Sequence, residues 1–126
     1  MISFLDLHKI NLRFEEEFKN KFTDFLDTGY YILGSNVTVF EEEFASYCGT
    51  NYCIGVGNGL DALRLILEGY KVLGKLSNND EVLVASNAYI ATILAIKQAG
   101  LTPVLVASED DTFNFNLNEL SNSITS

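Results

Sequence analysis

The chain has 126 residues, of which 48% are hydrophobic and 20% are charged, and its formal net charge at pH 7 is −9. This length and composition are typical of one globular domain or part of one, and they exclude intrinsic disorder. The acidic excess argues against a nucleic-acid partner, which requires a basic surface, and against binding to an anionic membrane.

No segment has the character of a targeting or membrane-spanning sequence. The amino terminus lacks a basic region followed by an apolar run, and no stretch reaches the roughly 18 apolar residues that span a bilayer. Cys48 and Cys53 are too few for a disulfide framework, so we expect small core residues, and His8 is the single histidine, so no zinc-type cluster is expected. These features predict a cytoplasmic protein without a metal site.

The first third of the chain has helical periodicity. Apolar residues recur at three- and four-residue intervals over residues 9–27, which predicts an amphipathic helix. Residues 30–34 form an aromatic-rich connection that we expect to be packed. A second helix is predicted to begin at Ser35 or Asn36, with glutamates 41–43 as a solvated face near its start.

The rest of the chain alternates short apolar runs with helical patterns. The apolar runs predict buried strands at residues 52–56, 81–85 and 103–106. Helices are predicted to begin near Gly59, Ile90 and Leu117. This alternation favours an α/β fold with a parallel sheet, in which ligands bind at the carboxyl ends of the strands. Those ends are Gly57–Asp61, Ser86–Tyr89 and Ala107–Asp111.

The glycine turn between the first predicted strand and its helix is a candidate phosphate site. Free N–H groups and the positive end of the helix dipole favour an anion there, and glycines allow close approach. The simplest structural interpretation is a tight turn with Asn58 or Asp61 capping the helix. The spacing Gly57-x-Gly59-x-x-Ala62 also satisfies the dinucleotide fingerprint G-x-G-x-x-G/A.

The acid that this fingerprint requires is missing from its place. Asp80 and Glu81 precede the next predicted strand, whereas a ribose-binding acid follows it. Tyr89 is near the carboxyl end of that strand, where an aromatic ring can stack on a flat heterocycle. A single phosphate with a flat ring suggests pyridoxal phosphate at least as readily as NAD.

Four blocks of sequence follow one another along the chain: Gly29–Thr50, Gly55–Leu63, Ser86–Thr92 and Thr112–Asn114. In this order they resemble the DegT-type sugar-nucleotide aminotransferases. The resemblance begins at Phe4 and continues to the chain end, and residues 58–63 are most similar to members that act on dTDP-3-keto-6-deoxyhexoses. It implies part of the large domain of a fold-type-I pyridoxal-phosphate-dependent transferase, a three-layer α/β/α fold. Residues 1–50 would form an N-terminal helical segment and substrate-side loop, and residues 51–126 the first three β-α units of the truncated large domain.

The resemblance also implies a reaction and a set of site residues. In this family pyridoxal phosphate takes an amino group from glutamate, releasing 2-oxoglutarate, and passes it to a nucleotide-linked keto sugar in amino-sugar and polysaccharide biosynthesis, in a homodimer. By position, Gly59 and Leu60 would donate backbone N–H groups to the cofactor phosphate, and Tyr89 would stack on its ring. Tyr30 and Tyr31 would lie on the substrate side. Leu60 stands where many members have Thr.

The family's Schiff-base lysine has no counterpart in this chain. In full-length members it lies beyond the position of residue 126, so the chain resembles the amino-terminal part of an enzyme, and we expect no transamination from it alone. The resemblance also separates the first predicted strand from the other two. Two alternatives are a pyridoxamine-phosphate-dependent sugar dehydratase of the same family and a truncated, non-catalytic paralogue that binds sugar nucleotide.

Overall fold

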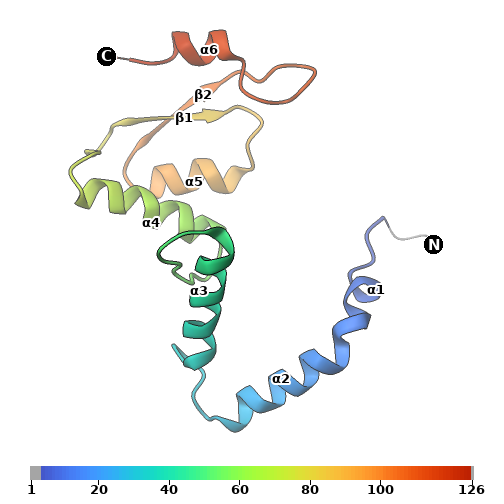
Figure 1. Cartoon of the computed structure of the whole chain (residues 1–126). Helices are drawn as coiled ribbons and strands as arrows, with labels where there is room; N and C mark the ends of the chain where they lie inside the picture. The colour runs from blue at the N-terminus through green and yellow to red at the C-terminus, as the bar shows by residue number, and fades with distance from the viewer. Residues whose placement is uncertain (1–3, 126) are drawn as a thin grey trace. The chain divides into compact units, whose positions relative to one another are not determined.

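The computed structural model describes residues 4–125 and divides the chain into two compact units, Met1–Gly55 and Val56–Ser126. The first unit is helical (Figure 1). Its elements are α1 (Leu7–Asn11), the 3-10 turn η1 (Leu12–Phe14), α2 (Glu15–Asp27) and α3 (Ser35–Cys48). The first predicted helix is therefore divided, with η1 between α1 and α2.

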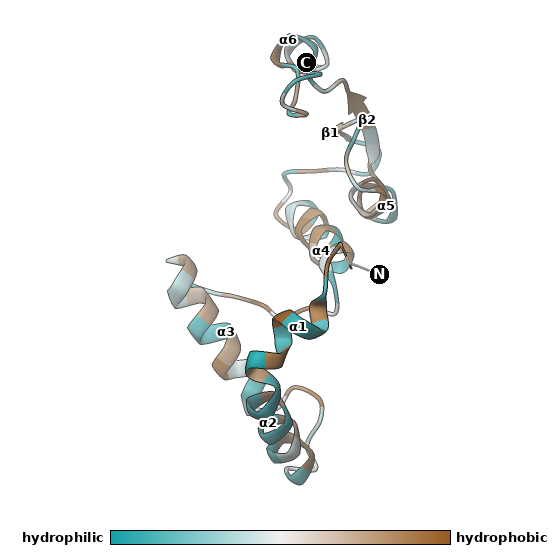
Figure 2. Cartoon of the chain, turned by 90° about the vertical axis from the view of Figure 1, so that its right-hand side faces the viewer, coloured by the Kyte–Doolittle hydropathy of each residue, from teal (hydrophilic) through white to brown (hydrophobic). Residues whose placement is uncertain are grey.

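The first unit is held together by caps and a few side-chain contacts. Hydrophilic and hydrophobic residues alternate along α2 and α3, as amphipathic helices require (Figure 2). Asp6 caps α1 by accepting a hydrogen bond from the Lys9 N–H at 3.0 Å. Gly49 caps the end of α3 and adopts a left-handed φ of 67°.

The expectation that both cysteines are core residues is wrong for Cys48, which is exposed, whereas Cys53 is partly buried.

Glu41 corrects the predicted solvated glutamate face. Its Oε1 atom accepts a hydrogen bond from the Gly55 N–H at 2.6 Å, and the residue is half-buried. The partner lies 14 residues away, in an extended segment after α3, so the contact is invisible to helical periodicity. Glu41 thus ties α3 to the chain that leads toward the glycine turn.

The second unit contains a parallel two-stranded sheet. Its elements are α4 (Gly59–Val72), β1 (Glu81–Ala85), α5 (Ile90–Gln98), β2 (Thr102–Val106) and α6 (Leu117–Asn122). The two strands pair from Glu81↔Thr102 to Ala85↔Val106. The core cluster lies where α5 and its flanking residues meet β1, and consists of Val84, Ile96, Ala99 and Leu101.

The predicted strand at residues 52–56 is not a strand among the described residues. This segment is extended without a ladder partner, and the sheet contains β1 and β2 alone. A strand is defined by hydrogen bonds to a neighbour, and residues 4–125 provide none for this segment. The expectation of three adjacent strands is therefore corrected to two.

Figure 1 shows where the strands and helices of the second unit begin and end. The carboxyl ends of β1 and β2 lie on the same side of the unit as the N-terminal ends of α4 and α5. In both views α6 lies on the opposite side of the sheet from α5 (Figures 1 and 2). Among residues 4–125, no helix combines the length and apolarity that crossing a bilayer requires.

Candidate functional site

The N-terminus of α4 leaves two backbone amides without partners. Asn58 is the N-cap: its Oδ1 accepts from the Asp61 N–H at 3.0 Å, and its carbonyl accepts from the Ala62 N–H at 3.1 Å. The N–H groups of Gly59 and Leu60 meet no acceptor among residues 4–125. Both point out of the first turn, where the helix dipole favours an anion.

Of the two caps that the sequence allowed, Asn58 is the one observed, and Asp61 does not cap the helix. The carboxylate of Asp61 instead accepts from Asn58 Nδ2 at 3.0 Å and lies 3.6 Å from Arg64. Asn58 takes the cap because α4 begins at Gly59, which makes Asp61 the third helical residue. The carboxylate is thus engaged by groups of its own helix, one of them cationic, which reduces its repulsion of an anion at the amides.

Gly59 has no conformational reason to be glycine. Its φ is outside the left-handed region, and a Cβ built on it would meet no heavy atom within 4 Å. Alanine would fit the same backbone and favour the helix more. Close approach of a ligand to the Gly59 amide is one physical reason for a glycine here.

Tyr89 is the residue whose ring the sequence analysis expects to stack on the cofactor. It is the N-cap residue of α5, and its carbonyl accepts from the Thr92 N–H at 3.0 Å, so its backbone is anchored to the helix. Its side chain is 80% exposed. An aromatic ring this exposed has both faces available to a flat ligand.

The residues after each strand form two loops, which we call the β1 loop (residues 86–89) and the β2 loop (residues 107–116). Asn87 joins them: its Oδ1 accepts from Ser108 Oγ at 2.8 Å, and its Nδ2 donates to the Phe113 carbonyl at 3.0 Å. Sequence reasoning missed this role, although Asn87 lies within a family-like block. An asparagine in a turn carries no signal of a partner 21 or 26 residues away.

The structure supports the argument against a dinucleotide site. Asp80 Oδ2 accepts from the Ser77 N–H at 2.8 Å, and Glu81 Oε2 accepts from Thr125 Oγ1 at 3.0 Å. Both acids precede or begin β1, at the amino end of the strand. They therefore lie at the amino end of the strand, whereas a ribose-binding acid would be needed at its carboxyl end, which Tyr89 follows.

The tyrosines of the predicted substrate-side loop lie in the first unit. They line a hollow of about 90 Å³ together with residues from the end of α2 and the start of α3. Tyr31 donates its hydroxyl to the Leu26 carbonyl at 3.1 Å and packs on Phe25 with ring centroids 5.2 Å apart. The Tyr30 hydroxyl has no partner among the described residues, and its side chain is 65% exposed. Tyr30 is therefore the more available of the two, in a hollow too small by itself for a sugar nucleotide.

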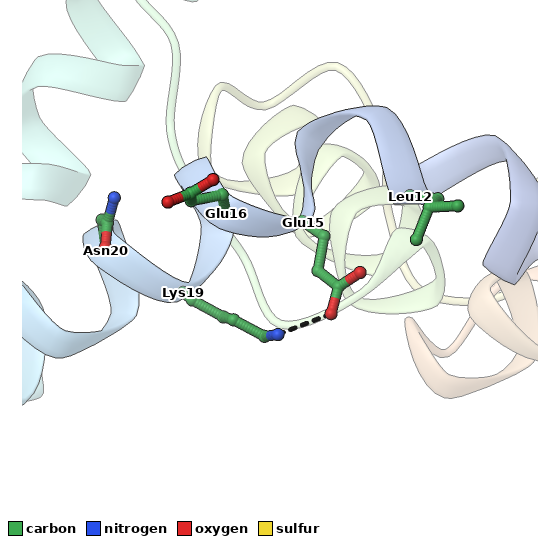
Figure 3. A pocket seen from close by; sticks show the side chains of 5 residues that line it. All are labelled: Leu12, Glu15, Glu16, Lys19 and Asn20. Atoms are coloured by element: carbon green, nitrogen blue, oxygen red, sulfur yellow. Dashed lines mark hydrogen bonds and ion pairs between the residues drawn. The ribbon is translucent and has the colours of Figure 1, made fainter.

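A second hollow in the first unit lacks the character of a binding site. It measures about 480 Å³ and is lined by Leu12, Glu15, Glu16, Lys19 and Asn20 (Figure 3). All five residues come from one continuous helical stretch, so no groups converge from different elements. Figure 3 shows Glu15 and Lys19 extended toward one another. The hydrogen bond from Lys19, and then its charge, lower the pKa of the Glu15 carboxyl from its ordinary value.

The lysines of the second unit lie away from the glycine turn. Lys71 is in the last turn of α4, where its Nζ donates to the Ala99 carbonyl at 2.9 Å, and Lys97 is in the last turn of α5. A helix as long as α4 separates its ends by roughly 20 Å. Lys75 follows α4 and lies over the Tyr70 ring. The described residues of this unit therefore place no lysine amine beside the glycine turn.

Comparison with known proteins identifies the family. Residues 13–126 match the DegT/DnrJ/EryC1/StrS aminotransferase family. The chain belongs to this family.

Three relatives show how much of the family fold the chain contains. It is 51% identical to dTDP-3-amino-3,6-dideoxy-α-D-galactopyranose transaminase from Aneurinibacillus thermoaerophilus, over all of this chain and 34% of that protein. The crystal structure of DesV from S. venezuelae matches 98% of this chain and 32% of its own, with 39% identity and a TM-score of 0.88. A dehydratase from E. coli, GDP-4-keto-6-deoxy-D-mannose-3-dehydratase with bound hydrated PLP, matches 82% of this chain and 27% of its own, with 25% identity and a TM-score of 0.75.

These matches confirm the resemblance to sugar-nucleotide aminotransferases and the predicted α/β fold of a partial large domain. This DegT/DnrJ/EryC1/StrS family chain spans about a third of the length of the curated relatives it matches. One of the matched structures contains pyridoxal phosphate in hydrated form.

Proposed function

We propose that this chain supplies the phosphate- and ring-binding part of a pyridoxal-phosphate-dependent aminotransferase. The enzyme moves an amino group from glutamate to a nucleotide-linked keto sugar, a dTDP-3-keto-6-deoxyhexose, for amino-sugar and polysaccharide biosynthesis. The observation that carries this proposal is that the N-terminal ends of α4 and α5 lie on the same side of the unit (Figure 1). The first of these ends leaves the Gly59 and Leu60 amides without partners, and the second is capped by Tyr89. The name of the 51% identical relative supports the choice of sugar.

The donor set fits a cofactor with one phosphate and a flat ring. The Gly59 and Leu60 amides donate to the phosphate, and the empty space at Gly59 admits its oxygen atoms. The Tyr89 ring covers one face of the pyridine. Pyridoxal phosphate, when bound, supplies the electron sink for amino transfer. The residues of this chain bind and orient it, and Tyr30 and Tyr31 contribute to the sugar-nucleotide side.

The lysine arrangement limits what the chain itself contributes. The lysines of the second unit lie at the far ends of α4 and α5 or beyond, so binding and orientation are its part of the chemistry. We further propose that the full-length enzyme is a homodimer and works in the cytoplasm. Cys48 and Cys53 are both free thiols, which fits a reducing compartment.

Purification of the full-length protein tests the proposal. The absorbance of added pyridoxal phosphate reports cofactor binding. Mass spectrometry follows the products that the protein forms from glutamate and a dTDP-3-keto-6-deoxyhexose. We expect an aminated sugar nucleotide and one equivalent of 2-oxoglutarate. Loss of a sugar hydroxyl without amination would favour the dehydratase alternative, and sugar-nucleotide binding without any turnover would favour the non-catalytic paralogue. Failure to bind pyridoxal phosphate would refute the proposal itself.

A further inference from the structure

The side chain of Asn87 continues the pairing of β1 and β2 where their backbone pairing ends. The Ser86 N–H donates to the Val106 carbonyl at 2.9 Å, immediately after the paired strands. One residue later, the Asn87 amide accepts from Ser108 and donates to the Phe113 carbonyl. A single side chain therefore uses both its acceptor and its donor to join the β1 loop to the β2 loop.

The carbonyl that Asn87 holds belongs to a residue in an unfavourable conformation. Phe113 has a φ of 58°, in the left-handed region that a non-glycine residue adopts at about 1–2 kcal/mol. Such a conformation persists where surrounding contacts determine it. The Phe113 N–H donates to the Glu109 carbonyl at 3.0 Å, and the Glu109 N–H donates to the Asn114 carbonyl at 2.9 Å. Asn87 adds the contact from outside the β2 loop.

The same side chain lies two residues before Tyr89. Between them, the Ala88 N–H donates to the Ala85 carbonyl at 3.0 Å. Beyond them, the Tyr89 carbonyl accepts from Thr92 in α5. The β1 loop is thus fixed to β1 and α5 by backbone bonds and to the β2 loop by Asn87, which leaves little freedom to the backbone that carries the Tyr89 ring.

We propose that Asn87 is a positioning residue for the cofactor site. By locking the β1 loop to the β2 loop, it orients the Tyr89 ring before the cofactor arrives, so that binding does not have to order this segment. The inference rests on the proposed function, because it assigns Asn87 a role toward pyridoxal phosphate through Tyr89. Asn87 itself contacts neither the cofactor nor the sugar in this proposal.

The test uses the full-length protein with four single variants and one double variant. Asn87→Ala removes both hydrogen bonds. Asn87→Asp keeps the acceptor for Ser108 but loses the donor to Phe113, and Ser108→Ala removes the other bond. Asn118→Ala is the control, since Asn118 is an exposed asparagine in α6 whose side chain makes no hydrogen bond among the described residues. Each variant is measured for its dissociation constant for pyridoxal phosphate, circular dichroism of the bound cofactor, apoprotein melting, and amide exchange in the β2 loop.

We expect Asn87→Ala and Asn87→Asp to raise the cofactor dissociation constant about two- to tenfold, which is the range for one hydrogen bond. Cofactor dichroism should weaken and amide exchange at Glu109 and Phe113 should accelerate, while apoprotein melting follows the Asn118→Ala control. Combining Asn87→Ala with Ser108→Ala should add nothing to Asn87→Ala alone, because Asn87→Ala has already removed the hydrogen bond from Ser108.

Three outcomes would overturn the proposal. An unchanged dissociation constant and dichroism in Asn87→Ala would remove the positioning role. If the melting temperature of the Asn87→Ala apoprotein falls enough to explain all of the lost cofactor affinity, the role of Asn87 is purely structural. If Asn87→Ala does not fold, Ser108→Ala and Asn87→Asp decide in the same way. A wild-type protein that does not bind pyridoxal phosphate would refute the proposed function, and the role of Asn87 toward the cofactor with it.

Discussion

At Gly59 the chain places a poor helix former in the first turn of α4 without needing its conformational freedom. The φ of Gly59 is not left-handed, and no neighbouring atom excludes a methyl group. Gly69, later in the same helix, is in the same position sterically. The difference between the two is the unpaired amide at Gly59, so a matched pair of substitutions separates helix stability from ligand binding.

We predict that Gly59→Ala and Gly69→Ala have the same effect on stability but differ in cofactor binding. Both should leave the apoprotein as stable or stabilise it by up to about 1 kcal/mol, because alanine restricts the unfolded chain. Only Gly59→Ala should weaken pyridoxal phosphate binding, by about tenfold or more, because a methyl group displaces a charged ligand from its donors. Thermal melting and cofactor titration measure the two effects. Equal cofactor affinity in both variants would show that no ligand approaches Gly59.

A second residue-scale prediction concerns the exposed ring of Tyr89. Tyr89→Ala should raise the cofactor dissociation constant about two- to tenfold, since aromatic stacking contributes about 0.5–1.5 kcal/mol. Tyr89→Phe keeps the ring and should bind as the wild type does. Because the side chain is 80% exposed, neither variant should change apoprotein melting. If the phenylalanine variant binds as weakly as the alanine variant, the hydroxyl and not the ring is the contact.

At the scale of elements, local patterns predicted most of the fold. The starts of α3, α4 and α5 and the whole of β1 follow from apolar periodicity and short apolar runs, which a contiguous segment carries by itself. The predicted strand at residues 52–56 failed because pairing with a neighbour is not a local property. The contact between Glu41 and Gly55 was missed for the same reason.

The candidate site was predictable to a similar extent. Gly59, Leu60 and Tyr89 became candidates because they follow strand-like runs in a pattern that resembles a known family, and their roles toward a cofactor stay predictions. The sequence left the cap open between Asn58 and Asp61, because a shift of a few residues in a helix start exchanges the two. Asn87 was not found as a connector, since its partners are distant in sequence.

The cap of α4 gives an element-scale prediction. Asn58→Ala should lower the melting temperature of the full-length protein by about 2–4 °C, because losing an N-cap costs about 1 kcal/mol. Asn58→Ser retains a side-chain oxygen for the Asp61 N–H and should restore most of the loss. Differential scanning calorimetry measures both. An alanine variant that melts with the wild type would mean that the hydrogen bond at 3.0 Å contributes nothing to stability.

At the scale of the whole molecule, many more large apolar residues are exposed than are buried in the core. Within residues 4–125 the buried hydrophobic residues are few and mostly small, and Val106 is the largest side chain there that is fully buried. Aromatic residues along both long helices of the first unit remain exposed, among them Phe18, Phe22, Phe40 and Phe44. The sheet has two strands, so each strand also has an unpaired edge. Exposed aromatic residues and unpaired strand edges of this kind are typical of contacts with further protein.

We therefore predict that a polypeptide of these 126 residues, expressed alone, associates with itself. Its net charge of −9 opposes association, but the charge is screened at physiological salt, whereas the exposed aromatic faces and strand edges are not. Size-exclusion chromatography with light scattering should give a mass well above 14.0 kDa, and a dye that binds exposed apolar surface should fluoresce strongly. The full-length protein should give a discrete dimer mass and weak dye fluorescence under the same conditions. A monodisperse 14.0 kDa species without dye binding would show that these faces are covered within the 126 residues themselves.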